Sequence, residues 1–227
     1  DEADEMLSKG FSSQIYDIFQ EIPQDVQVCL FSATMPSECV EITHKFMRDP
    51  IRILVKTEEV TLDGIRQYYI DVVQDNYKYE ILCDLYKTIS VSQTIIFCRT
   101  KQRVEMLQQQ LNDNNYAVSS IHSDLTTQER ETIIHNFKNG DSRILIATDL
   151  IARGIDIQQL SLVINYDLPI QKETYIHRIG RSGRYGRKGV AINFVTERDL
   201  GELDELQRFY NTKIMEMPQN IAEIISV

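Results

Sequence analysis

The segment QTIIFCRTKQRVEMLQQQL, residues 93–111, decides the fold, because a short apolar run stands directly before an amphipathic one. The run at 93–98 predicts a buried strand, and the periodicity of 101–111 predicts a helix. The same alternation continues on both sides of this segment. Further strands are expected at 65–72, 116–121, 143–147, 160–165 and 189–195, and further helices at 77–89, 127–138, 171–180 and 198–210. Such alternation is typical of an α/β fold in which a parallel sheet carries helices on both faces.

Before this alternating region the pattern is less regular. Apolar side chains recur at helical spacing in two segments and predict helical structure in both. The first segment, 6–22, is interrupted by Gly10, and the second is 36–46. Two short apolar runs, 26–31 and 51–55, are expected to be strands. Later in the chain, Thr126 and Glu129 match a capping box, so a helix should begin there.

A polar stretch without periodicity predicts a linker at 56–62. It separates residues 1–55 from a second domain at 63–227. The chain opens abruptly on Asp1-Glu2-Ala3-Asp4, with no strand before these acids. We therefore expect residues 1–55 to be the C-terminal part of a domain that begins upstream.

The composition limits what the protein can bind. The 227 residues carry a formal net charge of −10, and 42% of them are hydrophobic. The acidic balance argues against a protein that coats nucleic acid through bulk positive charge, so any contact with RNA or DNA must be local. No apolar run approaches the roughly 18 residues of a membrane span. Four widely spaced cysteines, without a zinc or disulfide pattern, predict buried free thiols.

One stretch departs from the acidic composition: HRIGRSGRYGRKG, residues 177–189, has five arginine and lysine side chains and no acid. Arg178, Arg181 and Arg184 recur at every third position, and on one helical turn they would share a face. Arginine binds phosphate oxygens in pairs, and glycine lets the backbone approach a ligand. The stretch therefore predicts a polyanion site, with a solvated basic turn as the alternative.

Other polar clusters follow predicted strands, and the carboxyl ends of parallel strands meet at one edge of a sheet. These clusters are residues 32–34, 98–100, 148–149 and 153–156. Adjacent Asp1 and Glu2 are the pairing expected where one carboxylate holds a magnesium ion and the next positions a water. Their alternative role is to complement a helix dipole.

Four of these motifs together resemble those of the DEAD-box RNA helicases. They are Asp1-Glu2-Ala3-Asp4, Ser32-Ala33-Thr34, Ala152-Arg153-Gly154-Ile155-Asp156 and His177-Arg178-Ile179-Gly180-Arg181-Ser182-Gly183-Arg184. The resemblance implies two RecA-like domains, ATP held between them and RNA bound across both. On that basis the chain would hold the tail of the first domain and the complete second domain. The sequence contains no G-x-x-x-x-G-K-[ST] phosphate loop.

The resemblance also implies roles for single residues at the nucleotide. As catalytic residues, Asp1 would hold Mg²⁺ and Glu2 would orient the attacking water, with Arg181 and Arg184 as arginine fingers. Further contacts with ATP, the ribose included, are implied for Gly154 and Asp156. ATP and Mg²⁺ are the cofactors that follow.

Two more groups of residues are implied by the same resemblance. Residues that couple the two domains would be Asp4, Ser32, Thr34, Arg153, His177 and Arg178. Residues that contact RNA would be Thr148, Thr100 and Arg130. Two positions depart from the family's usual pattern: Arg99 stands in place of Asn, and Thr127 in place of Gln. Either change could retune the RNA-facing side of the second domain.

The resemblance points to the translation-initiation branch of the family, and hence to an enzyme that unwinds mRNA structure. The alternatives are a slow-turnover RNA clamp of the exon-junction type and a phosphoryl-transfer switch that binds no RNA. The implied partners are single-stranded RNA, bound through its phosphates without sequence preference, and a helical scaffold protein such as initiation factor 4G. A cytoplasmic monomer without membrane contact is expected, or a nuclear protein if the clamp alternative holds. This chain by itself is expected to be inactive.

Overall fold

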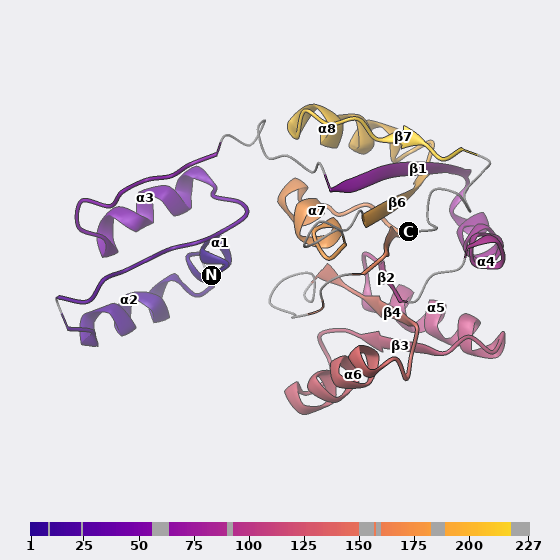
Figure 1. Cartoon of the computed structure of the whole chain (residues 1–227), viewed down its shortest axis with the longest axis horizontal. Coiled ribbons are helices and arrows are strands. Elements are labelled where there is room, and N and C mark those ends of the chain that lie inside the picture. Colours follow the sequence, from indigo (N-terminus) through magenta and orange to yellow (C-terminus); the bar gives the residue numbers. More distant parts are fainter. Residues whose placement is uncertain are drawn as a thin grey trace. The chain divides into compact units, whose positions relative to one another are not determined.

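The structure, a computed structural model, describes residues 1–8, 10–23, 25–55, 64–89, 93–149, 157, 160–182 and 189–218 (Figure 1). The chain divides into two compact units, Asp1–Thr57 and Glu58–Val227. Each unit is described by itself.

The first unit contains three helices: α1 (Ala3–Met6), α2 (Ser12–Glu21) and α3 (Ser37–Phe46). The aromatic rings of Phe19 on α2 and Phe46 on α3 pack together, with their centres 4.7 Å apart, and join the two longer helices. The chain turns at the interruption expected at Gly10, so the segment predicted to be helical at 6–22 is helical mainly in α2. Gly10 lies in that turn, and glycine is unfavourable in a helix interior.

The two strands expected in the first unit are not formed either. Residues 26–31 and 51–55 pair with no other strand among the described residues. Their apolar side chains are correspondingly exposed, to 66% for Phe31 and 92% for Ile51. A β-strand is stabilised by hydrogen bonds and packing from its neighbours, so an apolar run alone does not make one.

The second unit is built on a seven-stranded sheet in the order β3-β4-β2-β5-β6-β1-β7, and every pair is parallel. The strands are β1 (Ile65–Val73), β2 (Thr94–Phe97), β3 (Val118–Ile121), β4 (Ile144–Ala147), β5 (Leu162–Asn165), β6 (Gly189–Thr196) and β7 (Met215–Glu216). The predicted parallel α/β fold is thus confirmed. Only β7 was not expected, because two residues are too few for a periodic signal.

Helices cover both faces of this sheet. They are η2 (Asp75–Tyr77), α4 (Lys78–Thr88), α5 (Lys101–Asp113), α6 (Thr127–Asn139), α7 (Lys172–Ile179) and α8 (Leu200–Phe209). Successive strand residues point to opposite faces: Ile96 packs with Leu82 of α4 and Leu107 of α5, whereas Ile95 packs with Phe137 of α6. Helices α7 and α8 share a third cluster, over β1 and β6. Figure 1 shows the strands running from β7 and β1 at the top to β3 at the bottom.

One further prediction is confirmed, and another is confirmed in part. The Thr126 side chain accepts a hydrogen bond from the Glu129 amide while Glu129 binds the Thr126 amide, so the capping box starts α6. The four cysteines are free thiols, but only Cys39 and Cys98 are buried as expected, and Cys29 is exposed. In the part of the chain that the structure describes, no helix has the length and apolarity needed to cross a bilayer.

Substitutions at two glycines test the backbone conformations that the structure assigns to them. Gly140 ends α6 with φ +85°, whereas Gly201 lies inside α8 with open space around it. We predict that Gly140→Ala lowers the free energy of unfolding by about 1 kcal/mol, because a Cβ is strained in the left-handed region. Gly201→Ala should raise it by about 0.5 kcal/mol, since alanine favours the helix. Urea unfolding of both variants measures the difference, and losses of equal size would contradict the assigned conformations.

Candidate functional site

In the first unit, hydrogen bonds join the acidic N-terminal turn to residues 32–34. Ser32 Oγ donates to Asp4 Oδ1 at 2.6 Å, and Thr34 Oγ1 donates to Asp4 Oδ2 at 2.5 Å. The Ala3 amide also donates to the Phe31 carbonyl at 3.0 Å. Hydroxyl groups bound to a carboxylate at such distances form strong, charge-assisted hydrogen bonds. The structure therefore brings together three residues that the sequence analysis grouped, Asp4, Ser32 and Thr34.

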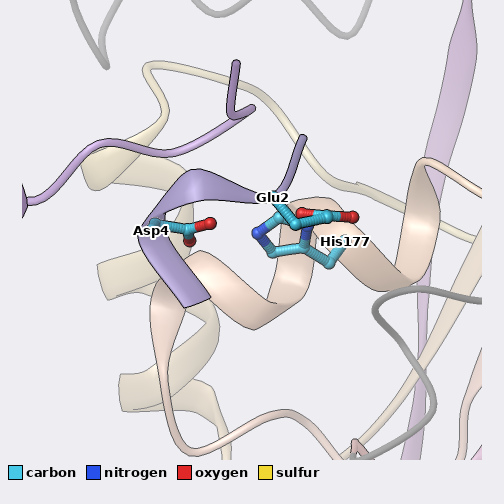
Figure 2. A group of neighbouring side chains, drawn as sticks. All are labelled: Glu2, Asp4 and His177. Carbon is cyan, nitrogen blue, oxygen red and sulfur yellow. The ribbon is translucent and has the colours of Figure 1, made fainter. Parts of the chain in front are cut away.

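The two remaining acids precede α1. The Glu2 amide donates to Asp1 Oδ1 at 2.9 Å, and the Asp1 side chain is exposed. Glu2 itself adopts a left-handed conformation, φ 55° and ψ 44°, which is uncommon for a residue with a Cβ. Figure 2 shows Glu2 and Asp4 at α1; it also draws His177, which belongs to α7 of the second unit.

In the second unit, the residues predicted to contact RNA lie near the carboxyl ends of three adjacent strands. Thr100 follows β2 and caps α5, accepting a hydrogen bond from the Arg103 amide. Thr148 follows β4. Arg130, on α6, donates through Nη2 to the Ser123 carbonyl at 2.6 Å, and Ser123 lies just beyond β3. Neighbouring strands thus place these three residues along one edge of the sheet.

The Arg178 side chain makes several polar contacts at this edge. It is 0% exposed. Its Nε donates to Asp149 Oδ1 at 2.5 Å, and its Nη1 donates to Asn165 Oδ1 at 3.1 Å and to the Asp167 carbonyl at 2.6 Å. The guanidinium also lies 5.1 Å from the centre of the Phe97 ring. Asp149 thus pairs with the charge of Arg178 within the unit, whereas the buried Nη2 of Arg178 has no hydrogen-bond partner among the described residues.

The rest of the arginine stretch is described as far as Ser182. Helix α7 ends at Ile179, one residue before the expected end at 180. Arg178 is therefore helical, whereas Arg181 lies beyond the helix and shares no helical face with it. Arg181 Nε donates to the His177 carbonyl at 3.2 Å. A Cβ at Gly180 would lie 2.8 Å from the Ile176 carbonyl oxygen, so close packing requires glycine there. Four predicted site residues, Arg153, Gly154, Asp156 and Arg184, lie outside the described residues.

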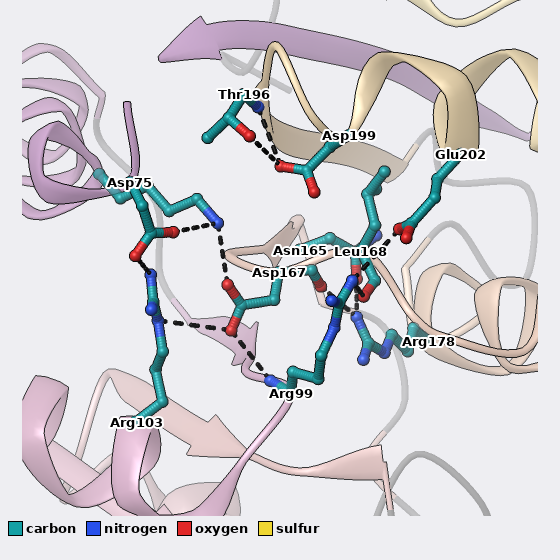
Figure 3. A network of polar contacts seen from close by, with 11 residues as sticks. Asp75, Arg99, Arg103, Asn165, Asp167, Leu168, Arg178, Thr196, Asp199 and Glu202 are labelled. Carbon is teal, nitrogen blue, oxygen red and sulfur yellow. Dashed lines mark hydrogen bonds and ion pairs between the residues drawn. The ribbon is translucent and has the colours of Figure 1, made fainter. Parts of the chain in front are cut away.

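A charged network surrounds Asp167, directly after β5 (Figure 3). Asp167 Oδ1 accepts from the buried Lys78 ammonium at 2.8 Å. Asp167 Oδ2 accepts from the Arg99 amide at 3.0 Å and lies 3.5 Å from Arg103 Nε. Lys78 and Arg103 also pair with Asp75, at 3.0 and 2.6 Å. One carboxylate thereby joins β5 to the turns that begin α4 and α5.

The electrostatics of Asp75 follow from these contacts. Burial alone would raise the pKa of Asp75, but hydrogen bonds from Arg103 and Lys78 outweigh it and hold that pKa below its ordinary value. A carboxylate with a lowered pKa stabilises the fold above its ordinary pKa, and this contribution is lost as the pH falls through the lowered value.

Arg99, one of the two departures from the usual pattern, contacts α8. Its Nη2 donates to Glu202 Oε2 and to the Leu168 carbonyl, both at 3.2 Å (Figure 3). Thr127, the other departure, is the exposed first residue of α6. In this structure Arg99 therefore joins β2 to α8 through its side chain.

Sequence reasoning missed the partners of Arg178 and Lys78. They are Asp149, Asn165 and Asp167. One signal was available for two of them. The strand LVIN, residues 162–165, ends on an amide that is fully buried, and Asp167 follows two residues later. A polar residue at a buried strand position requires a partner, although the sequence does not say which one.

Comparison with protein families matches both units. Residues 1–42 match the family model described as DEAD/DEAH box helicase, and residues 77–186 match the helicase conserved C-terminal domain. A protein of Kluyveromyces lactis named ATP-dependent RNA helicase eIF4A is 61% identical over 224 residues, 99% of this chain and 57% of that protein. The chain thus spans little more than half the length of this relative.

Solved structures agree with the family models. Dbp5 of S. cerevisiae, bound to RNA and ADP BeF3, is 36% identical with a TM-score of 0.91, over 99% of this chain and 61% of that one. The C-terminal domain of the DEAD-box protein Dbp5 is 38% identical with a TM-score of 0.67, over 73% of this chain and 99% of that one. The second of these structures is thus covered almost completely.

The ion pair between Arg178 and Asp149 leads to a stability prediction. Asp149→Ala leaves a buried guanidinium without its carboxylate and should lower the free energy of unfolding by about 2–3 kcal/mol, less than for a fully buried pair because Asp149 is 35% exposed. Asp84→Ala, which removes the exposed partner of Lys87, is the matched control and should have no measurable effect. Urea unfolding of the two variants makes the comparison. If the Asp149→Ala and Asp84→Ala variants were equally stable, the buried Arg178 guanidinium would not require its ion pair with Asp149.

Proposed function

Because this chain belongs to the DEAD-box helicase family, we propose that it is part of an ATP-dependent RNA helicase that acts in translation initiation. The observation that carries the proposal is its 61% identity, over 99% of its length, to a protein named ATP-dependent RNA helicase eIF4A. That name favours the helicase over the slow-turnover clamp and over a switch that binds no RNA. On the same basis we place the protein in the cytoplasm as a monomer.

We assign residues 1–55 to the C-terminal part of a first RecA-like domain, 56–62 to a linker and 63–227 to a complete second domain. Two observations support these boundaries. The two compact units meet between Thr57 and Glu58, inside the proposed linker. The two family models also match on either side of it.

The acidic turn fits a magnesium ion. Carboxylate oxygens are the ligands that Mg²⁺ prefers, and Asp1 is exposed, with Oδ1 bound to the Glu2 amide. Asp1 would hold the ion, which neutralises charge on the ATP phosphates when bound. Glu2 would orient the attacking water.

Arginine and glycine residues of the second domain complete the proposed nucleotide contacts. Arg181 and Arg184 would stabilise the negative charge that spreads over the transferred phosphoryl group. Asp156 would contact the ribose of ATP, and Gly154 would also contribute to the ATP site. These assignments rest on the family motif, and Arg181 is the one of the four that the structure describes.

Coupling between the two domains is assigned to six residues: Asp4, Ser32, Thr34, Arg153, His177 and Arg178. The hydrogen bonds of Asp4 with Ser32 and Thr34 support the first three as one group. For Arg178, the support is its ion pair with Asp149, the residue after Thr148. A shift at one end of this ion pair would be transmitted to the other.

RNA is proposed to bind at Thr100, Thr148 and Arg130, along the carboxyl edge of β2, β4 and β3. Contacts with phosphates give affinity without sequence preference. Because the chain carries a formal charge of −10, its binding should depend on this local edge. A helical scaffold protein such as initiation factor 4G is the protein partner that we propose, from the translation-initiation branch.

The proposal is tested by RNA-stimulated ATP turnover in the protein extended by its upstream domain. An arginine finger raises the rate of ATP turnover by about 10³- to 10⁵-fold. We expect Arg181→Lys to remove most of this rate enhancement in the extended protein. Lysine keeps the charge but loses the planar fork. The dissociation constant of ATP should change little, because the finger acts in the transition state.

Arg208→Lys is the matched control, since Arg208 is exposed on α8 and undergoes the same chemical change. The present chain alone should show no turnover with saturating RNA, because it lacks the phosphate loop. Near-normal turnover of Arg181→Lys would remove Arg181 from the site. A large fall in Tm in that variant alone would indicate a structural role instead.

A further inference from the structure

A line of buried polar side chains crosses the face of the sheet that α7 covers. Asn165 on β5 and Asn193 on β6 are register partners, and both are 0% exposed. Asn165 Nδ2 donates to Asn193 Oδ1 at 2.8 Å. Their neighbours on this face are apolar, among them Val163, Ala191 and Val195. An amide pair in such surroundings is costly unless every polar atom finds a partner, and aliphatic side chains would carry no such requirement.

Hydrogen bonds continue from this amide pair in both directions. Arg178 Nη1 donates to Asn165, and Asn193 Nδ2 donates to the Tyr68 carbonyl at 2.9 Å and to the Tyr175 hydroxyl at 3.2 Å. Tyr175 in turn donates to Gln67 Oε1 at 2.9 Å. Burial raises the pKa of Tyr175, so its hydroxyl remains protonated and able to donate.

The last hydrogen bond runs from Gln67 Nε2 to Thr212 Oγ1 at 3.2 Å. From the Arg178 guanidinium to Thr212, each side chain thus donates a hydrogen bond to the next one in the series. Hydrogen bonds that run head to tail polarise and strengthen one another. The guanidinium of Arg178 is the charged start of this chain of bonds.

The amide pair holds α7 at two points. Tyr175 and Arg178 are three residues apart, so they lie on one face of the helix. Asn193 binds the first of them and Asn165 the second. Two such contacts fix both the rotation of α7 about its axis and its position along the strands. They thereby fix His177, on the same helix, and Arg181, whose Nε binds the His177 carbonyl.

At its other end, Arg178 holds the turn after β4. Its ion pair with Asp149 orders the residue next to Thr148. The orientation of one guanidinium therefore depends on Asn165 and determines how the Thr148 turn and α7 lie relative to each other. Neither Asn165 nor Asn193 lies among the residues proposed to touch ATP or RNA.

We propose that the Asn165–Asn193 amide pair is a positioning element that orients Arg178, and so couples the RNA contact at Thr148 to the nucleotide contact at Arg181. The inference rests on the proposed function, because it requires RNA at the first residue and ATP at the second. Both asparagines act through Arg178 and are positioning residues.

The test uses the protein with its upstream domain and compares Asn165→Leu with Gln67→Leu. The first variant removes the acceptor from Arg178. The second breaks the same chain of hydrogen bonds on β1 and leaves every contact of Arg178 in place. For both, we would measure urea unfolding, kcat at saturating ATP and RNA, and the fold stimulation of turnover by RNA.

We expect both variants to lose stability, but only Asn165→Leu to lose kcat, by about 10- to 100-fold, together with most of its stimulation by RNA. Asn165→Asp keeps an oxygen acceptor for Arg178 and loses the donor to Asn193. It should therefore recover most of the turnover without recovering stability. If Asn165 had only a structural role, turnover and stability would recover together in Asn165→Asp.

The possible outcomes distinguish the two claims. Without RNA-stimulated turnover in the unsubstituted protein, the proposed function is wrong, and the positioning role is wrong with it. If the unsubstituted protein is stimulated and Asn165→Leu is stimulated equally, only the positioning role is wrong. The positioning role would also be wrong if Asn165→Leu and Gln67→Leu lost kcat to the same extent, in proportion to their loss of stability.

Discussion

The guanidinium of Arg178 carries a positive charge into the interior of the second unit, where a charge is tolerated only if it is paired and hydrogen-bonded. Its partners come from three places in the chain: Asp149 after β4, Asn165 at the end of β5, and the Asp167 carbonyl two residues later. Because all three must converge on one planar group, the turn after β4, the end of β5 and α7 cannot move independently. The geometry of the carboxyl edge depends on this convergence.

Asp167 organises the adjacent part of the same edge. Its carboxylate binds the Lys78 ammonium and the Arg99 amide, and its carbonyl binds Arg178. A parallel sheet brings its strand ends to one edge by topology, but topology does not orient side chains there. Buried ion pairs and amides supply that orientation, so the donors at this edge are held in place before any ligand arrives.

The sequence predicted the periodic part of the fold and missed what depends on distant partners. The strand and helix of residues 93–111 were visible because their apolar spacing is local. The segments 26–31 and 51–55 have the same apolar character, yet they form no strand, because pairing is not a local property. Strand β7 was too short to give a pattern.

The candidate site divides in the same way. Motifs predicted which residues matter at Asp4, Ser32 and Thr34, and the structure joins these three by hydrogen bonds. The spacing of Arg178 and Arg181 indicated a common helical face, but it could not indicate that Arg178 faces the sheet. Its carboxylate, Asp149, lies 29 residues earlier in the chain. No local pattern links the two.

The central claim is that Arg178 is buried in the second unit and paired there with Asp149. Hydrogen exchange of the Arg178 Nε–H, followed by NMR in the present chain, tests this most directly, with the exposed Arg208 as the internal reference. The account predicts that the Arg178 Nε–H exchanges orders of magnitude more slowly than that of Arg208, because exchange requires the fold to open. An Arg178 Nε–H that exchanges as fast as that of Arg208 would contradict the account.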